Sequence, residues 1–172
     1  MEFKNIAVWV FGIGAMLSLF LVYQQKSRKN LIICKLCADI CWVFHYICLG
    51  AYGGAVPNLV GIFRELVFVN REKQKWANLP FWPFVFIIAN LSLGMLTFSR
   101  AVNIIPVTAS VFVTLSLWCK NPRLTKLISA PVSAAFLVYD VLVASWIGVI
   151  NESISIFSII IYMVNNRKNK EG

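Results

Sequence analysis

Seven apolar stretches, separated only by short polar loops, are the feature that most limits how this chain can fold. A membrane-spanning helix needs about 20 predominantly apolar residues, and each stretch approaches that length. Of the 172 residues, 59% are hydrophobic and only 13% are charged, whereas soluble domains are nearer half apolar and a quarter charged. The sequence therefore predicts an all-α membrane protein with seven transmembrane helices, at about residues 6–24, 31–50, 54–70, 80–98, 103–119, 123–146 and 148–165. The last two helices are expected to be separated only by a turn near Trp146–Gly148.

The lysines and arginines of the loops are unevenly divided between the two sides of the membrane. With seven helices, one side receives only Lys4 and Arg100. Cytoplasmic loops carry the excess of basic residues, so we expect the N-terminus outside and the C-terminus in the cytoplasm. The net charge of +9 comes from dispersed loops and not from one patch, so no nucleic-acid partner is predicted. The basic residues of the cytoplasmic side are Lys26, Arg28, Lys29, Arg71, Lys73, Lys75, Lys120, Arg123, Lys126, Arg167, Lys168 and Lys170.

An internal repeat appears when the chain is aligned with itself at an offset of 94 residues. Residues 23–63 then lie over residues 117–157 without a gap, and Gly54, for example, falls on Gly148. The first three helices are therefore expected to repeat as the last three, in the same orientation because a single helix links them. This predicts a parallel 3+1+3 arrangement, with a first triple-helix bundle at 1–76, a linker helix at 77–101 and a second triple-helix bundle at 102–172.

Two stretches of the sequence resemble a known family. WVFHYICLGAYGGA, which Arg64 follows, and IIPVTASVFVTLSLWCKNPRLTK are similar to the YgjV family of bacterial inner-membrane proteins, and the likeness covers most of the chain. This resemblance implies a multi-pass protein of the bacterial inner (plasma) membrane, and it implies no substrate. The 3+1+3 plan and Pro106, early in the fifth helix, more distantly resemble the SWEET and PQ-loop sugar-transporter architecture. Asn58 lies in the helix that corresponds to the one with the substrate-binding asparagine of those transporters. The sequence departs from their pattern in the first helix, where Gly12 and Gly14 occupy the place at which the repeat would put a counterpart of Pro106.

Four cysteines and the single histidine lie in the segment CKLCADICWVFHYIC, residues 34–48. Cys34 and His45 are separated by roughly 16 Å of helical rise, so this helix offers one metal ion two or three ligands. The repeat places no further ligand opposite them. Packing between helices is the preferred interpretation, and metal or thiol chemistry is the alternative. No metal and no cofactor is predicted. The residues that share this face are Cys34, Cys37, Cys41, His45 and Cys48.

A second face of the same helix is polar and aromatic, and the repeat matches it with a similar face of the sixth helix. A substrate site at a repeat interface should draw on both copies. These two stripes, with Asn58 of the third helix, are therefore predicted to line a solute pathway. The stripes consist of Lys35, Asp39, Trp42 and Tyr46 in the second helix, and of Ser129, Ser133, Phe136 and Asp140 in the sixth.

Charged side chains at membrane depth are costly, so those of the third helix are functional candidates. Arg64 and Glu65 fall in its cytoplasmic third, near the predicted depth of Lys35 and Asp39. We expect ion pairs of Lys35 with Asp39 and of Arg64 with a carboxylate. Arg64 and Glu65 are interpreted as an inner gate whose ion pairs break and re-form, and a purely structural ion-pair cluster is the alternative.

His45 and Asp140 are candidates for proton coupling. Burial disfavours the charged form of an aspartate, and no basic residue is predicted beside Asp140. We expect Asp140 to be protonated, in contact with water, or paired with His45 across the interface. An interfacial aspartate that merely reaches water is the alternative.

Together these features predict transport of a small solute by alternating access between two triple-helix bundles, with hinges at Gly12, Gly14 and Pro106. The sequence has no phosphate-binding loop, zincin pair or nucleophile elbow, so an enzyme is not expected. One alternative is a structural or accessory membrane protein without transport, and a less favoured one is a protein that handles metals or thiols. The expected partners are the lipid bilayer and a small solute, and a homo-oligomer is compatible with the sequence.

Overall fold

The computed structural model describes the backbone of residues 2–25, 27–119 and 122–171, and the side chains of residues 5–22, 25, 27–119, 127–161 and 163. This part of the chain forms seven α-helices and two short 3-10 helices, and it contains no strand. The all-helical prediction is confirmed, and each α-helix overlaps one predicted apolar stretch. The helices are α1 (Glu2–Gln24), α2 (Arg28–Leu49), α3 (Tyr52–Val69), η1 (Trp76–Asn78), α4 (Trp82–Leu96), η2 (Ala101–Asn103), α5 (Ile104–Trp118), α6 (Pro122–Leu142) and α7 (Trp146–Glu171).

Several of these helices are apolar enough to lie in a membrane. Within the described residues, three segments have both the length and the composition to cross it, namely Asn5–Val22, Arg28–Leu49 and Ala101–Trp118. Three further apolar helices are shorter, namely Trp82–Leu96, Leu127–Leu142 and Trp146–Ile161. α3 belongs to neither group, because Asn58, Arg64 and Glu65 interrupt its apolar residues. The polar residues that weaken α3 as a membrane span are placed in the interior of the protein.

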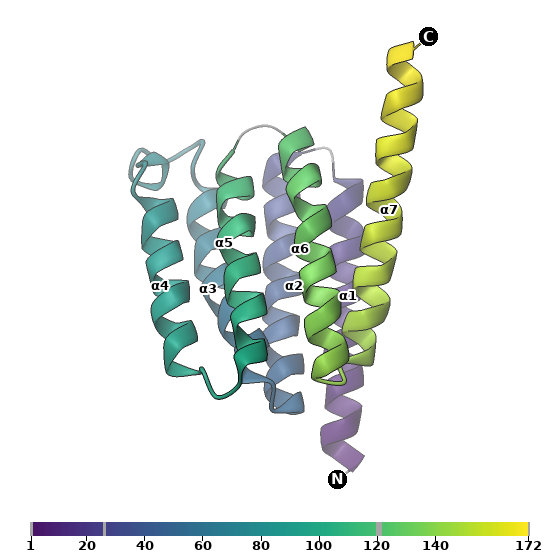
Figure 1. Cartoon of the computed structure of the whole chain (residues 1–172). Coiled ribbons are helices and arrows are strands. Elements are labelled where there is room, and N and C mark those ends of the chain that lie inside the picture. Colours follow the sequence, from purple (N-terminus) through teal and green to yellow (C-terminus); the bar gives the residue numbers. More distant parts are fainter. Residues whose placement is uncertain (1, 26, 120–121, 172) are drawn as a thin grey trace.

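Six of the seven helices form a closed ring. α1 packs on α2, α2 on α3, α3 on α5, α5 on α6, α6 on α7, and α7 on α1. α4 lies outside this ring, against α3 and α5 (Figure 1). The helices stand side by side, and the two termini lie at opposite ends of the array (Figure 1). We refer to the end where α2, α4 and α6 begin as the basic end, and to the other as the opposite end.

The described loop cations are concentrated at the basic end. Arg100 lies at the opposite end, between α4 and η2, whereas the start of α2 and the loop after α3 carry Arg28, Lys29, Arg71, Lys73 and Lys75. The orientation of the protein in the membrane stays a prediction. The other cations on which it depends lie outside the described side chains, and they are Lys4, Lys26, Lys120, Arg123, Lys126, Arg167, Lys168 and Lys170.

The turn between α6 and α7 lies at residues 143–145, so the prediction of a turn at residues 146–148 was wrong. Ala144 adopts a left-handed backbone conformation, with φ of 56°. The amide of Ser145 donates a hydrogen bond to the carbonyl oxygen of Asp140 at 2.8 Å. Gly148 lies inside α7, where a Cβ atom would collide with the carboxyl group of Asp140. The glycine that suggested a turn is therefore a position of close helix packing.

The residues predicted as hinges lie in regular helix. α1 runs without interruption through Gly12 and Gly14. Pro106 is in the first turn of α5, where a backbone N–H has no partner within the helix. A Cβ atom on Gly12 would lie 2.8 Å from Ile147 Cδ1 and 2.9 Å from His45 Nδ1. Gly12 thus allows α1 to pack closely against α2 and α7.

Alanine substitutions at the two glycines of α1 should have different effects. We expect Gly12→Ala to destabilise the fold by about 1–3 kcal/mol, because the added methyl group overpacks a buried contact. A Cβ atom on Gly14 would meet only Cys41 Sγ, at 3.4 Å. Gly14→Ala should be neutral or slightly stabilising, since alanine is the better helix former. Thermal unfolding of both purified variants measures the difference, and equal melting temperatures would contradict the packing role of Gly12.

Candidate functional site

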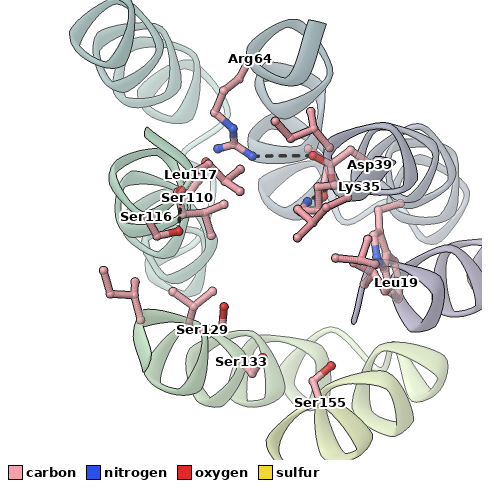
Figure 2. Close-up of a pocket in the computed structure, with 18 of the residues that line it drawn as sticks. Leu19, Lys35, Asp39, Arg64, Ser110, Ser116, Leu117, Ser129, Ser133 and Ser155 are labelled. Carbon is pink, nitrogen blue, oxygen red and sulfur yellow. Dashed lines mark hydrogen bonds and ion pairs between the residues drawn. The ribbon is translucent and has the colours of Figure 1, made fainter. Parts of the chain in front are cut away.

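A cavity of about 360 Å³ lies inside the ring, and α1, α2, α3, α5, α6 and α7 all contribute to its wall. Its volume is in the range of small-molecule sites. The wall includes Ser27 and Cys119, which are exposed at the basic end, so the cavity reaches the surface there. Figure 2 shows Lys35, Asp39 and Arg64 on one side of this space and Ser129, Ser133 and Ser155 on the other, while apolar side chains such as Leu19 and Leu117 form other parts of the wall.

Most residues predicted for the solute pathway belong to the wall of this cavity. The stripe of α2 and three members of the stripe of α6 face the same space. Asp140, Glu65 and His45 are not wall residues, and their exposed fractions are 1%, 0% and 0%. The predicted residues that line the cavity are Lys35, Asp39, Trp42, Tyr46, Asn58, Arg64, Ser129, Ser133 and Phe136.

Two cations and two carboxylates meet at the wall between α2 and α3. Lys35 Nζ forms an ion pair with Asp39 Oδ1, one turn along α2. Arg64 Nη2 lies 3.8 Å from Asp39 Oδ2 and 2.9 Å from Glu65 Oε1. Both expected ion pairs are therefore present. Arg64, Asp39 and Glu65 are at most 2% exposed, and buried charges are stable only when they are paired. We call these four residues the charge cluster.

Neighbouring helices fit closely around the charge cluster. A Cβ atom on Gly61 would collide with Asp39 Oδ2, so the carboxylate reaches α3 only because this residue has no side chain. Arg64 Nη1 donates a hydrogen bond to Thr114 Oγ1 at 2.9 Å. The Thr114 hydroxyl in turn donates to the carbonyl oxygen of Ser110 at 2.8 Å. Through Thr114, the charge cluster connects α2 and α3 to α5.

Two arginines bind the end of α5 at the mouth of the cavity. Arg28 Nη2 donates to the carbonyl oxygen of Leu117 at 3.2 Å, and Arg28 Nη1 lies 3.5 Å from Glu72 Oε1. Arg71 donates to the carbonyl oxygen of Trp118, and its guanidinium carbon lies 3.5 Å above the centre of the Trp118 ring. Partial burial lowers the pKa of Arg71, and the positive charge of the nearby Arg28 lowers it further. Because the last carbonyls of a helix lack partners within it, these cations stabilise the end of α5.

Aromatic side chains close the cavity toward the opposite end. The Tyr46 hydroxyl donates a hydrogen bond to Asp140 Oδ1 at 2.7 Å. The rings of Tyr46 and Tyr139 are in edge contact, with centroids 5.9 Å apart, and the Tyr139 hydroxyl lies 3.4 Å from the carbonyl oxygen of Ala51. A Cβ atom on Gly54 would lie 2.8 Å from Tyr139 Cε1, so α3 packs tightly on this layer. We call Tyr46, Tyr139 and Asp140 the aromatic seal.

His45 lies beside the aromatic seal and is bound on both ring nitrogens. Nδ1 is 2.9 Å from the carbonyl oxygen of Val8, and Nε2 is 2.9 Å from Ser145 Oγ. A carbonyl oxygen only accepts, so Nδ1 carries a proton. In the neutral ring, Nε2 then accepts a hydrogen bond from the Ser145 hydroxyl. Asp140 is bound by Tyr46, so the expected alternative of a pair between His45 and Asp140 is replaced by these two contacts.

The cysteine face of α2 is separate from the wall of the cavity. Cys41 lies against Gly14 of α1, whereas Cys37 and Cys119 are exposed. The five cysteines are free thiols. Among the described side chains, no three His, Cys, Asp or Glu residues come together in a way that could hold a metal ion.

The polar residues of α5 and of the turn after α6 were not identified from the sequence. When the chain is aligned with itself at the offset of 94 residues, Ser110 and Thr114 fall on the apolar residues Met16 and Phe20. The prediction of the pathway required polar residues in both copies of the repeat, so it did not include them. Two hydroxyls four residues apart in an otherwise apolar helix were the signal that could have pointed to them. Ser145 had no comparable signal, because its contact with His45 arises only from the fold.

Comparison with known proteins gives one match. A sequence model of the Imp-YgjV family, described as a bacterial inner membrane protein, matches residues 6–170. No curated protein and no solved structure matches the chain.

Proposed function

Because the chain belongs to the Imp-YgjV family of bacterial inner membrane proteins, we propose that it is a multi-pass transporter that moves a small solute by alternating access and catalyses no reaction. The observation that carries this proposal is the cavity inside the ring, whose mainly apolar wall carries charged and hydroxyl side chains on two sides. It reaches the surface at the basic end and stops at the aromatic seal. A transporter in one of its two states needs such a cavity, open to one side of the membrane and closed to the other.

The packing of the helices supports a 3+1+3 plan for this transporter, with bundles at 1–76 and 102–172 and a linker at 77–101. α1, α2 and α3 pack consecutively, as do α5, α6 and α7, while α4 lies outside the ring. Tyr46 and Asp140, which are 94 residues apart, are hydrogen-bonded to each other. Positions that correspond in the two halves therefore meet at the interface, where repeat transporters place their substrates.

The basic end is proposed to face the cytoplasm, which places the N-terminus outside and the C-terminus inside. The described loop cations are concentrated at that end, as the positive-inside rule requires. The cavity is then open to the cytoplasm, and Arg64 of its wall acts as a gate together with the adjacent Glu65. His45 and Asp140, the residues predicted for proton coupling, lie at and beside the aromatic seal.

The SWEET and PQ-loop plan supports alternating access more directly than it supports a sugar as the solute. Asn58, the counterpart of the substrate-binding asparagine, lines the cavity but donates its amide to the carbonyl oxygen of Gly54 in its own helix, at 2.7 Å. One of its two amide N–H groups is therefore used within α3. The wall instead offers Lys35, Asp39 and Arg64 of the charge cluster, several serine hydroxyls and the aromatic rings of Trp42 and Phe136.

Labelling of a single cysteine inside the cavity tests alternating access without knowledge of the solute. Phe136→Cys, in a chain whose five native cysteines are replaced by alanine, should react with a charged, membrane-impermeant thiol reagent from both faces of the membrane. The reaction from the cytoplasmic face is expected to be the faster one. Vesicles of right-side-out and inverted orientation provide the two measurements.

The control for this experiment is Val138→Cys, two residues along α6, whose side chain is 53% exposed on the outside of the ring. It should remain unlabelled from both faces, because the bilayer excludes a charged reagent there. Labelling of Phe136→Cys from the cytoplasmic face alone would contradict alternating access and would favour a non-transporting accessory protein. Labelling from neither face would contradict an open cavity.

A further inference from the structure

Two oxygen atoms of the charge cluster lack a hydrogen-bond donor. Asp39 Oδ2 and Glu65 Oε2 are fully buried, and neither accepts a hydrogen bond from the described residues. The cations contact mainly the other oxygen of each group, since Lys35 pairs with Asp39 Oδ1 and Arg64 with Glu65 Oε1. A buried acceptor without a donor costs on the order of 1–3 kcal/mol. A structure with two such atoms in one cluster calls for a ligand that supplies the missing donor.

The two unpartnered oxygens belong to carboxyl groups that share one guanidinium group. Arg64 Nη2 lies 3.8 Å from Asp39 Oδ2 and 2.9 Å from Glu65 Oε1. Two ionised carboxylates offer only acceptors, so neither can donate a hydrogen bond to the other unless one of them carries a proton. Carboxyl pairs that share one proton in this way occur where like charges are held too close for both groups to ionise.

A proton fits this position better than a metal ion does. Arg64 Nη2 already lies 3.8 Å from Asp39 Oδ2, and Lys35 Nζ binds the other oxygen of the same carboxylate. A further full cation would be repelled by both groups. α5 contributes the hydroxyls of Ser110 and Thr114 near the charge cluster, while Glu152 of α7 adds one carboxylate across the cavity. With Glu152 included, two cations face three carboxylates, and one proton makes the set neutral.

We propose that Asp39 and Glu65 together bind one proton, and that it is the coupling ion of transport. The second half of this statement rests on the proposed transport function, and the first half does not. Asp39 belongs to the cavity wall, so the proton enters from the cavity. When it leaves, the second carboxylate attracts Arg64 more strongly. Arg64 is bound to Thr114 of α5, so proton binding changes the force between the two halves of the ring.

Infrared spectroscopy of the purified protein tests the proton site directly. The C=O stretch of a protonated carboxyl group is separate from the bands of carboxylates, and the chain has only seven Asp and Glu residues. Wild-type protein at neutral pH should show this band. It should be lost in Asp39→Asn and also in Glu65→Gln, because an amide donor replaces the shared proton in each variant. Asp140→Asn, at the aromatic seal, should leave this band unchanged.

Three results would overturn the proton site. They are the absence of the band in wild-type protein, its persistence in Asp39→Asn, and its persistence in Glu65→Gln. Persistence in Asp39→Asn alone would mean that Glu65 is protonated without sharing. If one variant does not fold, the other one and the wild-type spectrum still decide the question.

Coupling is tested separately with the labelling of Phe136→Cys. The ratio of labelling from the two membrane faces should change with pH, by up to about tenfold per pH unit for one coupled proton. The same ratio should be independent of pH after Glu65→Gln is added. A ratio that never varies with pH, together with a normal infrared band, would reject the coupling role and keep the proton site. Labelling from one face only would reject the transport function instead.

Discussion

Replacement of Arg64 by alanine is expected to destabilise the protein by about 3–5 kcal/mol, the usual consequence of removing one partner from a buried ion pair. The guanidinium group contacts both Asp39 and Glu65. Without it, Lys35 is the remaining cation for two buried carboxylates, and Thr114 loses its donor. Thermal unfolding of the detergent-solubilised variant measures the effect.

Two further variants show whether the loss comes from the uncompensated charge. Arg100→Ala removes an exposed arginine and should change stability by no more than about 0.5 kcal/mol. The double variant Arg64→Met, Glu65→Met should regain much of the stability lost in Arg64→Ala, because apolar side chains of similar size often replace a buried ion pair without cost. A single variant Arg64→Ala as stable as wild type would show that the charge cluster does not hold α2, α3 and α5 together.

In the variant Tyr46→Phe, the aromatic seal is expected to be open for a larger fraction of the time. The substitution removes a 2.7 Å hydrogen bond to Asp140 and leaves a buried carboxyl oxygen without that donor. Such a loss costs about 1–3 kcal/mol, and 1.4 kcal/mol corresponds to a tenfold change in an equilibrium constant. If the seal opens during transport, labelling of Phe136→Cys from the outer face should become roughly tenfold faster.

Tyr139→Phe is the matched control, since Tyr139 is also a buried tyrosine of the aromatic seal. Its hydroxyl lies 3.4 Å from a carbonyl oxygen, and this longer contact is weaker. We expect the outer-face labelling rate to change little in Tyr139→Phe. Equal rates in the two variants would contradict the role of the bond between Tyr46 and Asp140. A lower melting temperature in Tyr46→Phe with no outer-face labelling would mean that the seal is purely structural.

The helices and one side of the cavity could be predicted because they follow from local patterns. Apolar length alone located the seven helices to within a few residues. The polar stripe of α2 could be found because Lys35, Asp39, Trp42 and Tyr46 share one face of a helix, and its partner in α6 because the repeat aligns the two. Both stripes line one cavity, apart from Asp140.

The contacts that depend on the tertiary fold could not be predicted in the same way. The bond from Arg64 to Thr114 joins residues 50 positions apart, and no periodicity relates them. The positive φ of Ala144 was hidden because alanine is not a usual residue for that conformation. Gly148 was misread as a turn because a glycine that allows close packing looks the same in a sequence as one that allows a bend.

The position of α4 explains how one polypeptide can contain both halves of the ring. No described residue of α4 belongs to the cavity wall, and the amide of Asn90 in this helix donates to the carbonyl oxygen of Val107 in α5 at 2.7 Å. α4 returns the backbone to the opposite end, where α1 also begins. As a result, α5 runs parallel to α1 (Figure 1). Without such a segment, α5 would begin at the basic end and run antiparallel to α1.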